Sequence, residues 1–508
     1  MSAKKTAVII GAGVGGLALA NILAKAGYAV TVYEKNATPG GRMGVLKQKG
    51  FTFDTGPSWY LMKDVFEQYF GLFDKKPSDY YQLTRLDPGY KVFFEETNPI
   101  TVGGDLTQSL AAFENFEQGA ADKLQRYLNR GENNYHAAMK YILFNPFKRI
   151  SNLVTSEFLK ALPSFAGIFT KSLHAYVSKQ FKRVELQQIL EYPSVFLGAS
   201  PFNTPALYQL MSYLDFKEGV FYPKKQGMYA ITEALCALGK ELGVSYVYNA
   251  EVNKILIADG RARGVIVNGK TIDADLVISN ADLHFTETSL VEPAYRTYPQ
   301  SYWDKRTAGP SGLVMYLGVE GSLPELEHHN LFFIKDWRGN FDKIYREKVW
   351  PKQASMYVSR TTATDPSTAP KGHENIFVLV PLPPGTKDTN YDTDQYVDGY
   401  LAQLEKMSGI ADLRTRIVFK EVRTPEYYGT TFHAWQNTAL GMSHTLRQTA
   451  FLRPSVKSKK VENLYYVGAG TQPGIGLPMC LISAQLVYKH LVNDWSPSAI
   501  AAIKQVES

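Results

Sequence analysis

The sequence predicts an α/β protein whose N-terminal part consists of a strand, a tight turn, a helix and a second strand. A short apolar run, Ala7 to Ile10, is typical of a buried parallel strand. Three glycines follow with the spacing G-x-G-x-x-G, at Gly11, Gly13 and Gly16. Apolar residues over positions 17–23 then recur with the period of a helix. This order of elements predicts a dinucleotide-binding unit.

Each glycine suits that role. Gly11 lets the chain turn, Gly13 lets the backbone approach a pyrophosphate, and Gly16 lets the helix pack on the strand. The helix N-terminus favours the negative charge of the pyrophosphate. The second strand, Ala29 to Tyr33, ends in Glu34, where a carboxylate can accept hydrogen bonds from ribose hydroxyls. An acid at this position indicates an unphosphorylated ribose.

Two further motifs indicate which dinucleotide is bound. Pro39-Gly40-Gly41-Arg42 and Phe53-Asp54-Thr55-Gly56-Pro57 resemble the second and third flavin contacts of the FAD-dependent amine oxidase and carotenoid desaturase superfamily. The arginine in the first motif can donate two parallel hydrogen bonds to phosphate oxygens. The resemblance implies FAD as cofactor and a Rossmann-like FAD-binding domain of the GR2-type flavoprotein fold. It also implies a mixed-sheet substrate domain and a helical, membrane-associating insertion.

Composition limits the class of protein. A chain of 508 residues is too long for one simple core, so we expect two or three joined subdomains. The net charge of +7 is mildly basic, and no nucleic-acid-binding motif accompanies it. Cys236 and Cys480 lack metal-ligand spacing, so we expect no metal site and free thiols in a reducing cytoplasm. No apolar run is long enough to span a bilayer.

The predicted domains interleave along the chain. The predicted boundaries are 1–104, 219–290 and 456–495 for three parts of the FAD-binding domain, 105–218 for the helical insertion, 291–455 for the substrate-binding domain and 496–508 for a C-terminal tail. Patterning predicts helices over Leu61–Phe73, Leu106–Asn145, Glu185–Asp215, Ile231–Leu242 and Met479–Leu491. Strands are predicted over Tyr90–Glu95, Ile100–Val102, Val244–Val252, Lys254–Ala258, Ala262–Val267, Asp275–Ile278, Leu313–Val319, Met356–Ser359, Ile376–Val380 and Leu464–Val467.

A basic, apolar segment runs from Lys140 to Arg183. Phenylalanine, leucine and isoleucine alternate there with lysine and arginine, against the single acid Glu157. Such a helix can lie in a bilayer interface with its lysines toward anionic headgroups. We expect a cytoplasmic protein that associates peripherally with the cytoplasmic membrane; the alternative is a helix pair packed on the protein itself.

The C-terminal stretch from Asn463 to Pro478 carries a second glycine-rich signature between a strand and a helix. With the upstream segments 434–436, 439–441 and 451–454, it resembles the C-terminal signature of bacterial and archaeal phytoene desaturases. Gln472 and the helix entry Leu477-Pro478-Met479-Cys480 depart from the commoner family pattern. The full set of residues expected to bind the cofactor is Gly11, Gly13, Gly16, Glu34, Lys35, Gly41, Arg42, Gly56, Pro57, Val252, Gly468, Gly470, Gly476 and Leu477.

The resemblance implies conversion of phytoene, a C40 carotenoid, to more unsaturated carotenes such as lycopene. Desaturation removes a hydride and a proton from adjacent carbons, and flavin accepts the hydride. Oxygen or a quinone would reoxidise the flavin. Aromatic faces can shelter positive charge, so Trp59, Tyr60, Phe432 and Trp435 are the candidate lining residues. The proton acceptor is open, with His433 and His444 as weak candidates.

Three other functions remain as alternatives. The chain could be another carotenoid desaturase, isomerase or ketolase of the family. It could be a flavin amine or porphyrinogen oxidase on the same fold. A non-catalytic prenyl-lipid carrier, like the Rab escort proteins, is disfavoured by the intact glycines and Glu34. A homo-oligomer also stays open.

Overall fold

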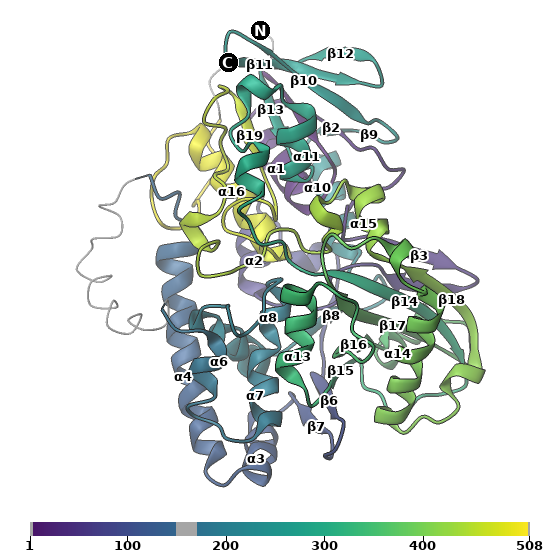
Figure 1. The fold of residues 1–508 in the computed structure, drawn as a ribbon. Helices are drawn as coiled ribbons and strands as arrows, with labels where there is room; N and C mark the ends of the chain where they lie inside the picture. Colours follow the sequence, from purple (N-terminus) through teal and green to yellow (C-terminus); the bar gives the residue numbers. More distant parts are fainter. Residues whose placement is uncertain (1–3, 149–169, 506–508) are drawn as a thin grey trace.

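The computed structural model describes residues 4–148 and 170–505 (Figure 1). A five-stranded parallel sheet forms its first layer, in the order β19-β13-β1-β2-β9. The strands are β1 (Thr6–Ile10), β2 (Ala29–Tyr33), β9 (Ser245–Val247), β13 (Leu276–Ser279) and β19 (Leu464–Tyr466). Three distant parts of the chain therefore build one sheet, whereas the exact domain boundaries stay a prediction.

Helix α1 (Val14–Lys25) is the central helix of this layer and is buried from Val14 to Leu23. It packs between α10 (Ala230–Glu241) and α16 (Leu477–Leu491). Four of the residues from 15 to 20 are glycine or alanine, which lets both neighbouring helices pack closely against α1. The N-termini of α1 and α16 thus belong to the same layer.

A small antiparallel sheet stands beside this layer at the top of Figure 1. It consists of β10 (Val252–Ala258), β11 (Arg261–Val267) and β12 (Lys270–Asp273). The prediction of a single strand over 244–252 is wrong, because β9 ends at Val247 and Val252 begins β10. Between them Asn249 adopts a left-handed φ of 53° and turns the chain. The Ala250 N–H then donates to the Glu34 carbonyl at 2.8 Å, which brings Val252 beside the end of β2.

A seven-stranded mixed sheet forms the second layer, in the order β18-β14-β17-β16-β15-β6-β7. Only the β15/β6 pair is parallel. Its strands are β6 (Tyr90–Phe94), β7 (Ile100–Val102), β14 (Ser311–Glu320), β15 (His329–Phe333), β16 (Met356–Ser359), β17 (His373–Leu382) and β18 (Ile417–Arg423). Helix α14 (Thr393–Ser408) covers one face of this sheet, where Val397 and Leu401 join its core. The other face looks toward the helical layer.

The helical layer gathers at the lower left of Figure 1. It contains α3 (Leu106–Phe116), α4 (Ala120–Ala138), α6 (Leu173–Val177), α7 (Val184–Glu191), α8 (Pro193–Phe196) and α9 (Leu210–Tyr213). Leu124, Leu128 and Ile189 pack from this layer onto the seven-stranded sheet. The middle of the predicted membrane segment, residues 149–169, lies outside the described residues. Over the described part of the chain, no helix is long and apolar enough to cross a membrane.

The remaining elements connect these layers. They are α2 (Lys63–Gly71), α11 (Leu283–Phe285), α12 (Gln300–Trp303), α13 (Trp337–Asp342), α15 (Pro425–Phe432), β3 (Val45–Gln48), β4 (Phe51–Asp54), β5 (Leu83–Arg85) and β8 (Phe221–Pro223). With the exception of the 244–252 strand, the predicted strands that fall on described residues are confirmed to within a few residues.

Candidate active site

One cavity of about 530 Å³ joins the N-terminal glycine loop to the apolar space between the seven-stranded sheet and the helical layer. Most of the predicted cofactor residues lie in its wall: Gly11, Gly13, Glu34, Lys35, Gly41, Arg42, Gly56, Pro57, Val252, Gly476 and Leu477. Gly16 and Gly468 are packed behind that wall, and Gly470 lines a small neighbouring pocket. The structure therefore brings together residues from five distant stretches of sequence.

Asn280 fills the space between the two glycine-rich loops. A Cβ on Gly13 would lie 2.6 Å from Asn280 Nδ2, and a Cβ on Gly468 would lie 2.7 Å from Asn280 Oδ1. A Cβ on Gly16 would lie 2.4 Å from the Gly11 carbonyl oxygen, and a Cβ on Gly15 would lie 2.9 Å from Gly468 Cα. Glycine therefore makes room for the Asn280 side chain and lets the two loops approach each other closely. Asn280 itself was missed; its signal is a polar residue at the carboxyl end of a parallel strand, where ligands bind in such sheets.

The Glu34 carboxylate is buried and orders the loop at the end of β2. Its Oε2 accepts the Ala12 N–H at 2.8 Å, and its Oε1 accepts the Asn36 N–H and side-chain amide, both at 2.9 Å. Oε1 thus uses both of its lone pairs, whereas Oε2 accepts one bond and can still accept a hydrogen bond from a ligand hydroxyl in the cavity.

Arg42 provides a direct test of whether the site fits a dinucleotide. Its Nε is buried and has no hydrogen-bond partner among residues 4–148 and 170–505. Its Nη2 makes one long bond of 3.4 Å to the Thr438 carbonyl, and its guanidinium lies 5.7 Å from the Phe432 ring centroid. A guanidinium with a buried and unpaired Nε is costly without an anion. A diphosphate between Arg42 and the glycine loop would provide that anion, so the residues fit the group.

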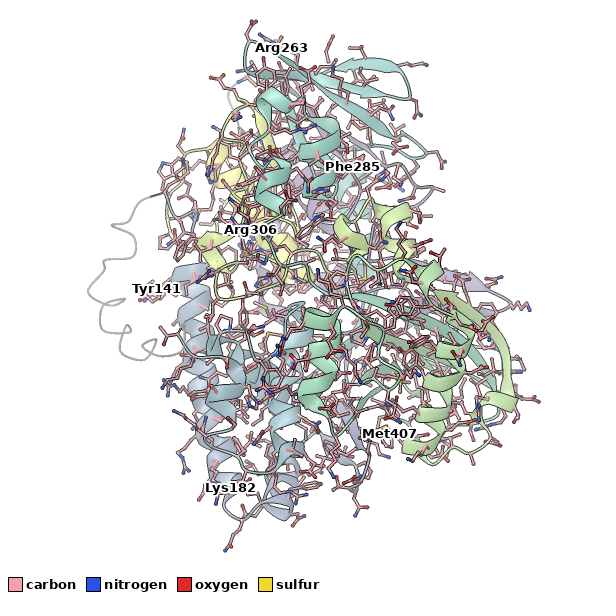
Figure 2. The ribbon with its side chains drawn as sticks, in the orientation of Figure 1. Tyr141, Lys182, Arg263, Phe285, Arg306 and Met407 are labelled. Carbon is pink, nitrogen blue, oxygen red and sulfur yellow. The ribbon has the colours of Figure 1, made fainter. Side chains whose placement is uncertain are left out.

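His433 lies among polar residues of the cavity wall, and its role as acceptor of the substrate proton stays a prediction. Its Nε2 lies 2.8 Å from Glu251 Oε1 and 3.2 Å from Lys35 Nζ. Its ring stacks on Phe285, which Figure 2 labels, with the centroids 4.0 Å apart. Glu251 and Lys35 are neighbours of Glu34 and Val252 in the wall, so His433 lies beside residues that are expected to bind the nucleoside.

His444, the other candidate proton acceptor, has a hydrogen-bond partner at each ring nitrogen. The Ile475 N–H donates to its Nε2 at 3.1 Å, so the ring proton is on Nδ1, which lies 2.7 Å from Tyr208 Oη. Both ring nitrogens are therefore used. Burial, and then the nearby Arg453, hold the pKa of His444 well below its usual value. His444 positions the Gly474–Gly476 turn in a neutral form.

Arg453 anchors the second glycine loop and was not assigned a role from the sequence. Its guanidinium donates to the carbonyls of Met442, Gln448, Ala469 and Thr471 at 2.8–3.3 Å. Burial lowers its pKa to about 10. Four carbonyls from two segments thus converge on one buried side chain, which a motif cannot reveal because the carbonyls carry no sequence signal.

The apolar half of the cavity lies on the uncovered face of the seven-stranded sheet. Leu331, Phe333, Phe377 and Leu379 form its floor. Tyr192, Phe196, Leu207 and Met211 from the helical layer face them, and Trp337 and Phe341 of α13 lie farther along the wall. Trp59 also lies in the wall and stacks on His329, with the centroids 4.5 Å apart and the rings 11° from parallel.

Two predicted lining residues lie elsewhere. Tyr60 is fully buried in the core, where it stacks on Phe66 and shares a hydrogen bond of 2.9 Å with Tyr81. Adjacent residues on an extended chain point to opposite sides, so Trp59 and Tyr60 cannot both face the cavity. Trp435 lines the small neighbouring pocket instead and packs against Trp303. Phe432 lies in the main wall, beside Arg42.

Residues 14–487 match the family described as flavin containing amine oxidoreductase. The chain is 42% identical over 489 residues to a carotenoid 3,4-desaturase of Haloarcula japonica, covering 96% of this chain and 98% of that protein. It belongs to the flavin-containing amine oxidoreductases and, among them, to the carotenoid desaturases. A zeta-carotene-forming phytoene desaturase of Myxococcus xanthus is 35% identical over 494 residues, covering 96% and 93% of the two chains.

A putrescine oxidase bound to putrescine shares the fold, with a TM-score of 0.61 at 14% identity over 97% of this chain and 99% of that one. This likeness shows the architecture alone. The family assignment makes the protein a flavin-dependent oxidoreductase, in agreement with the cavity that joins the glycine loops to an apolar compartment.

A buried carboxyl group beside the cavity gives a pH-dependent prediction. Tyr192 Oη donates to Asp215 Oδ2 at 2.5 Å, while Asp215 Oδ1 has no partner within the described part of the chain. Burial raises the pKa of Asp215 to about 7. The folded protein thus keeps this proton longer than the unfolded chain, so its contribution to stability is lost as the pH rises toward 7.

We therefore expect Asp215→Asn to stabilise the protein relative to wild type at about pH 8 more than at about pH 5, by on the order of 3 kcal/mol. Thermal unfolding of both proteins across this interval, followed by circular dichroism, measures the difference. A difference that does not change with pH would contradict the predicted protonation of Asp215. Asp342→Asn, at an ion pair with Arg346 on the surface, is the control without a buried carboxyl.

Proposed function

We propose that the protein is an FAD-dependent carotenoid desaturase that takes phytoene as substrate and forms more unsaturated carotenes such as lycopene. The observation that supports this most strongly is the continuity of the cavity. One end is lined by the glycine loop, Glu34 and Arg42, and the other by apolar side chains of the sheet and the helical layer. A long hydrocarbon can thus reach a cofactor bound at the loop without crossing water.

FAD, when bound, supplies the hydride acceptor for the reaction. Gly13 and Arg42 would hold its diphosphate, Glu34 its ribose hydroxyls, and the backbone at Val252 its adenine. The apolar floor would orient the polyene and exclude water from the reacting carbons. The faces of Trp59 and Phe196, whose centroids lie 5.3 Å apart, could stabilise positive charge on the chain as hydride leaves.

A second candidate is 3,4-desaturation of a carotenoid. The higher identity to the archaeal 3,4-desaturase than to the bacterial phytoene desaturase favours it. Both reactions use the same cofactor and the same apolar path, so substrate preference separates them.

Expression in bacteria that accumulate either phytoene or lycopene, followed by pigment chromatography, tests the proposal. Conversion of phytoene supports phytoene as substrate, and conversion of lycopene alone supports the second candidate. If neither pigment changes although the purified protein contains FAD, the carotenoid assignment fails. Amine oxidation, measured as hydrogen peroxide release from polyamines, is then the function to test.

We also propose that the protein works at the surface of the cytoplasmic membrane, with oxygen or a quinone reoxidising the flavin. Exposed apolar side chains gather in one loop: Leu446, Phe451 and Leu452. Phe451 contacts Phe147, with the ring centroids 5.6 Å apart, and Phe147, Thr449 and Ala450 lie in the cavity wall. An apolar surface at the rim of the cavity favours uptake of a lipid from a bilayer.

Replacing Phe451 and Leu452 by serine is expected to weaken binding to phosphatidylglycerol vesicles at least tenfold, since about 1.4 kcal/mol of lost apolar burial suffices. Vesicle flotation measures the binding. Val418→Ser, at a similarly exposed residue on β18, provides the control and should bind as wild type does. Unchanged flotation of the double variant would place the membrane contact elsewhere.

A further inference from the structure

A polar group interrupts the apolar floor of the cavity. Across β15 and β16, His329 pairs with Ser359 and Leu331 pairs with Tyr357, so these four side chains share the face of the sheet that lines the cavity. Tyr357 lies in the cavity wall and is hydrogen-bonded to His329, with 2.7 Å between Oη and Nδ1. A tyrosine and a histidine thus form a hydrogen-bonded pair, with Ser359 on the same face, beside the apolar side chains of Leu331, Phe333 and Phe377.

The direction of this hydrogen bond decides which group can take up a proton. Burial raises the pKa of the Tyr357 phenol, so the hydroxyl keeps its proton. In the direction that a proton relay requires, this hydroxyl donates to His329 Nδ1 and the histidine proton is on Nε2. That nitrogen has no hydrogen-bond partner in the part of the chain that the structure describes.

His329 is held as a neutral base. Its side chain is fully buried, and the Trp59 ring stacks on it. Burial, and then the neighbouring His328, lower the pKa of His329 well below its usual value. The Nδ1 lone pair of His329 accepts only the Tyr357 hydroxyl, whereas Nε2 of His444 accepts a backbone N–H. Of the two Tyr–His pairs at this cavity, only Tyr357–His329 can take up a proton without breaking a bond to the backbone.

We propose that Tyr357 accepts the proton released in the desaturation and that His329 receives the proton that Tyr357 gives up. This inference rests on the proposed function and names the base that it requires. Bound flavin would be the oxidant, and it would take up the hydride that leaves one substrate carbon with both electrons of its C–H bond. The adjacent C–H bond supplies the electrons of the new double bond. Its proton moves to Tyr357 Oη as the phenolic proton moves to His329 Nδ1, and the imidazolium later releases it to solvent.

A C–H group next to a carbocation is strongly acidic, so a neutral imidazole is a strong enough base to receive its proton even in a buried site. Positioned proton transfer typically contributes on the order of 10²–10⁴ in rate. Tyr357 would be catalytic in this step, and His329 would act through it.

The test compares Tyr357→Phe and His329→Asn with wild type. The asparagine Oδ1 can replace Nδ1 as the acceptor of the Tyr357 hydrogen bond, but an amide cannot take a proton at neutral pH. We expect both variants to bind FAD as wild type does and to desaturate phytoene at least ~100-fold more slowly. Tyr60→Phe, which removes a buried hydroxyl that bonds to Tyr81 outside the cavity, should desaturate at the wild-type rate.

Deuterated phytoene separates a chemical role from a structural one. Substrates carry deuterium at one or the other carbon of the bond that becomes unsaturated. In Tyr357→Phe, proton loss should become rate-limiting, so the isotope effect should increase at the carbon that loses the proton and decrease at the carbon that loses the hydride. If the rate falls but the two isotope effects do not change in this way, Tyr357 only supports the fold, and the proposal is overturned.

A measurement without turnover tests the hydrogen bond itself. In protein with ¹⁵N-labelled histidine, the His329 signals, assigned by their loss in His329→Asn, should show a proton on Nε2 and a bare Nδ1. A proton on Nδ1 would overturn the proposal. If wild type desaturates no carotenoid, both the proposed function and this inference fall; if it does and Tyr357→Phe matches it, the inference alone falls.

Discussion

Gly56→Ala is expected to prevent the protein from retaining flavin and to abolish desaturation. A Cβ at this position would lie 1.8 Å from the Arg42 carbonyl oxygen and 2.9 Å from the Arg42 carbonyl carbon. Both are backbone atoms, so no side-chain rotation relieves the clash. The segment after β4 would have to separate from the Gly41–Arg42 turn, which moves two predicted flavin contacts at once.

The measurement is the flavin content of the purified variant, read from its visible spectrum, together with pigment formation in cells. Gly71→Ala is the matched control, since a Cβ there meets nothing within 4 Å. It should retain flavin as wild type does. If Gly56→Ala also keeps its flavin and its activity, this turn does not contact the cofactor.

Arg453→Met is expected to destabilise the protein by at least ~3 kcal/mol, because it leaves four buried carbonyl oxygens without their donor. The Ala469–Thr471 segment would lose its attachment to Met442 and Gln448. Because this segment leads into α16, flavin should also dissociate more readily. Thermal unfolding, with flavin fluorescence recorded in the same scan, follows both effects.

The stability of Arg453→Lys should lie between those of Arg453→Met and wild type, because a single ammonium group cannot reach four carbonyls in the planar arrangement of a guanidinium. Arg346→Met removes an exposed ion pair with Asp342 and should change the unfolding free energy by no more than about 0.5 kcal/mol. If Arg453→Met and Arg346→Met unfold alike, Arg453 does not anchor the loop.

The sequence was sufficient to predict the parallel layer of the fold. Its strands are short and apolar, its turns are marked by glycine, and β1, α1 and β2 are consecutive, so local patterning carries the information. The strand over 244–252 was wrong because a single left-handed residue, Asn249, breaks an otherwise strand-like pattern. In the sequence, only the asparagine indicates such a turn.

The candidate site was predictable only where one motif supplies it. Gly13, Glu34 and Arg42 follow from recognisable spacings, and the structure brings all three to one cavity. His329 and Tyr357 could not be paired from the sequence, because their contact depends on which strands of the seven-stranded sheet are neighbours. The two histidines near the C-terminal signature were favoured for their position along the chain, yet their actual partners are Glu251 and Ile475.

Hydride transfer from a carotenoid to flavin can be measured in an anaerobic single turnover. The purified holoenzyme, with oxidised FAD bound, is mixed with phytoene in phosphatidylglycerol vesicles, and the flavin spectrum and the carotenoids are followed together. We expect the oxidised flavin band to disappear as one new double bond forms per flavin reduced. Oxidised flavin that persists with phytoene and equally with lycopene would contradict it, because hydride transfer from a carotenoid to flavin would then not occur in this cavity.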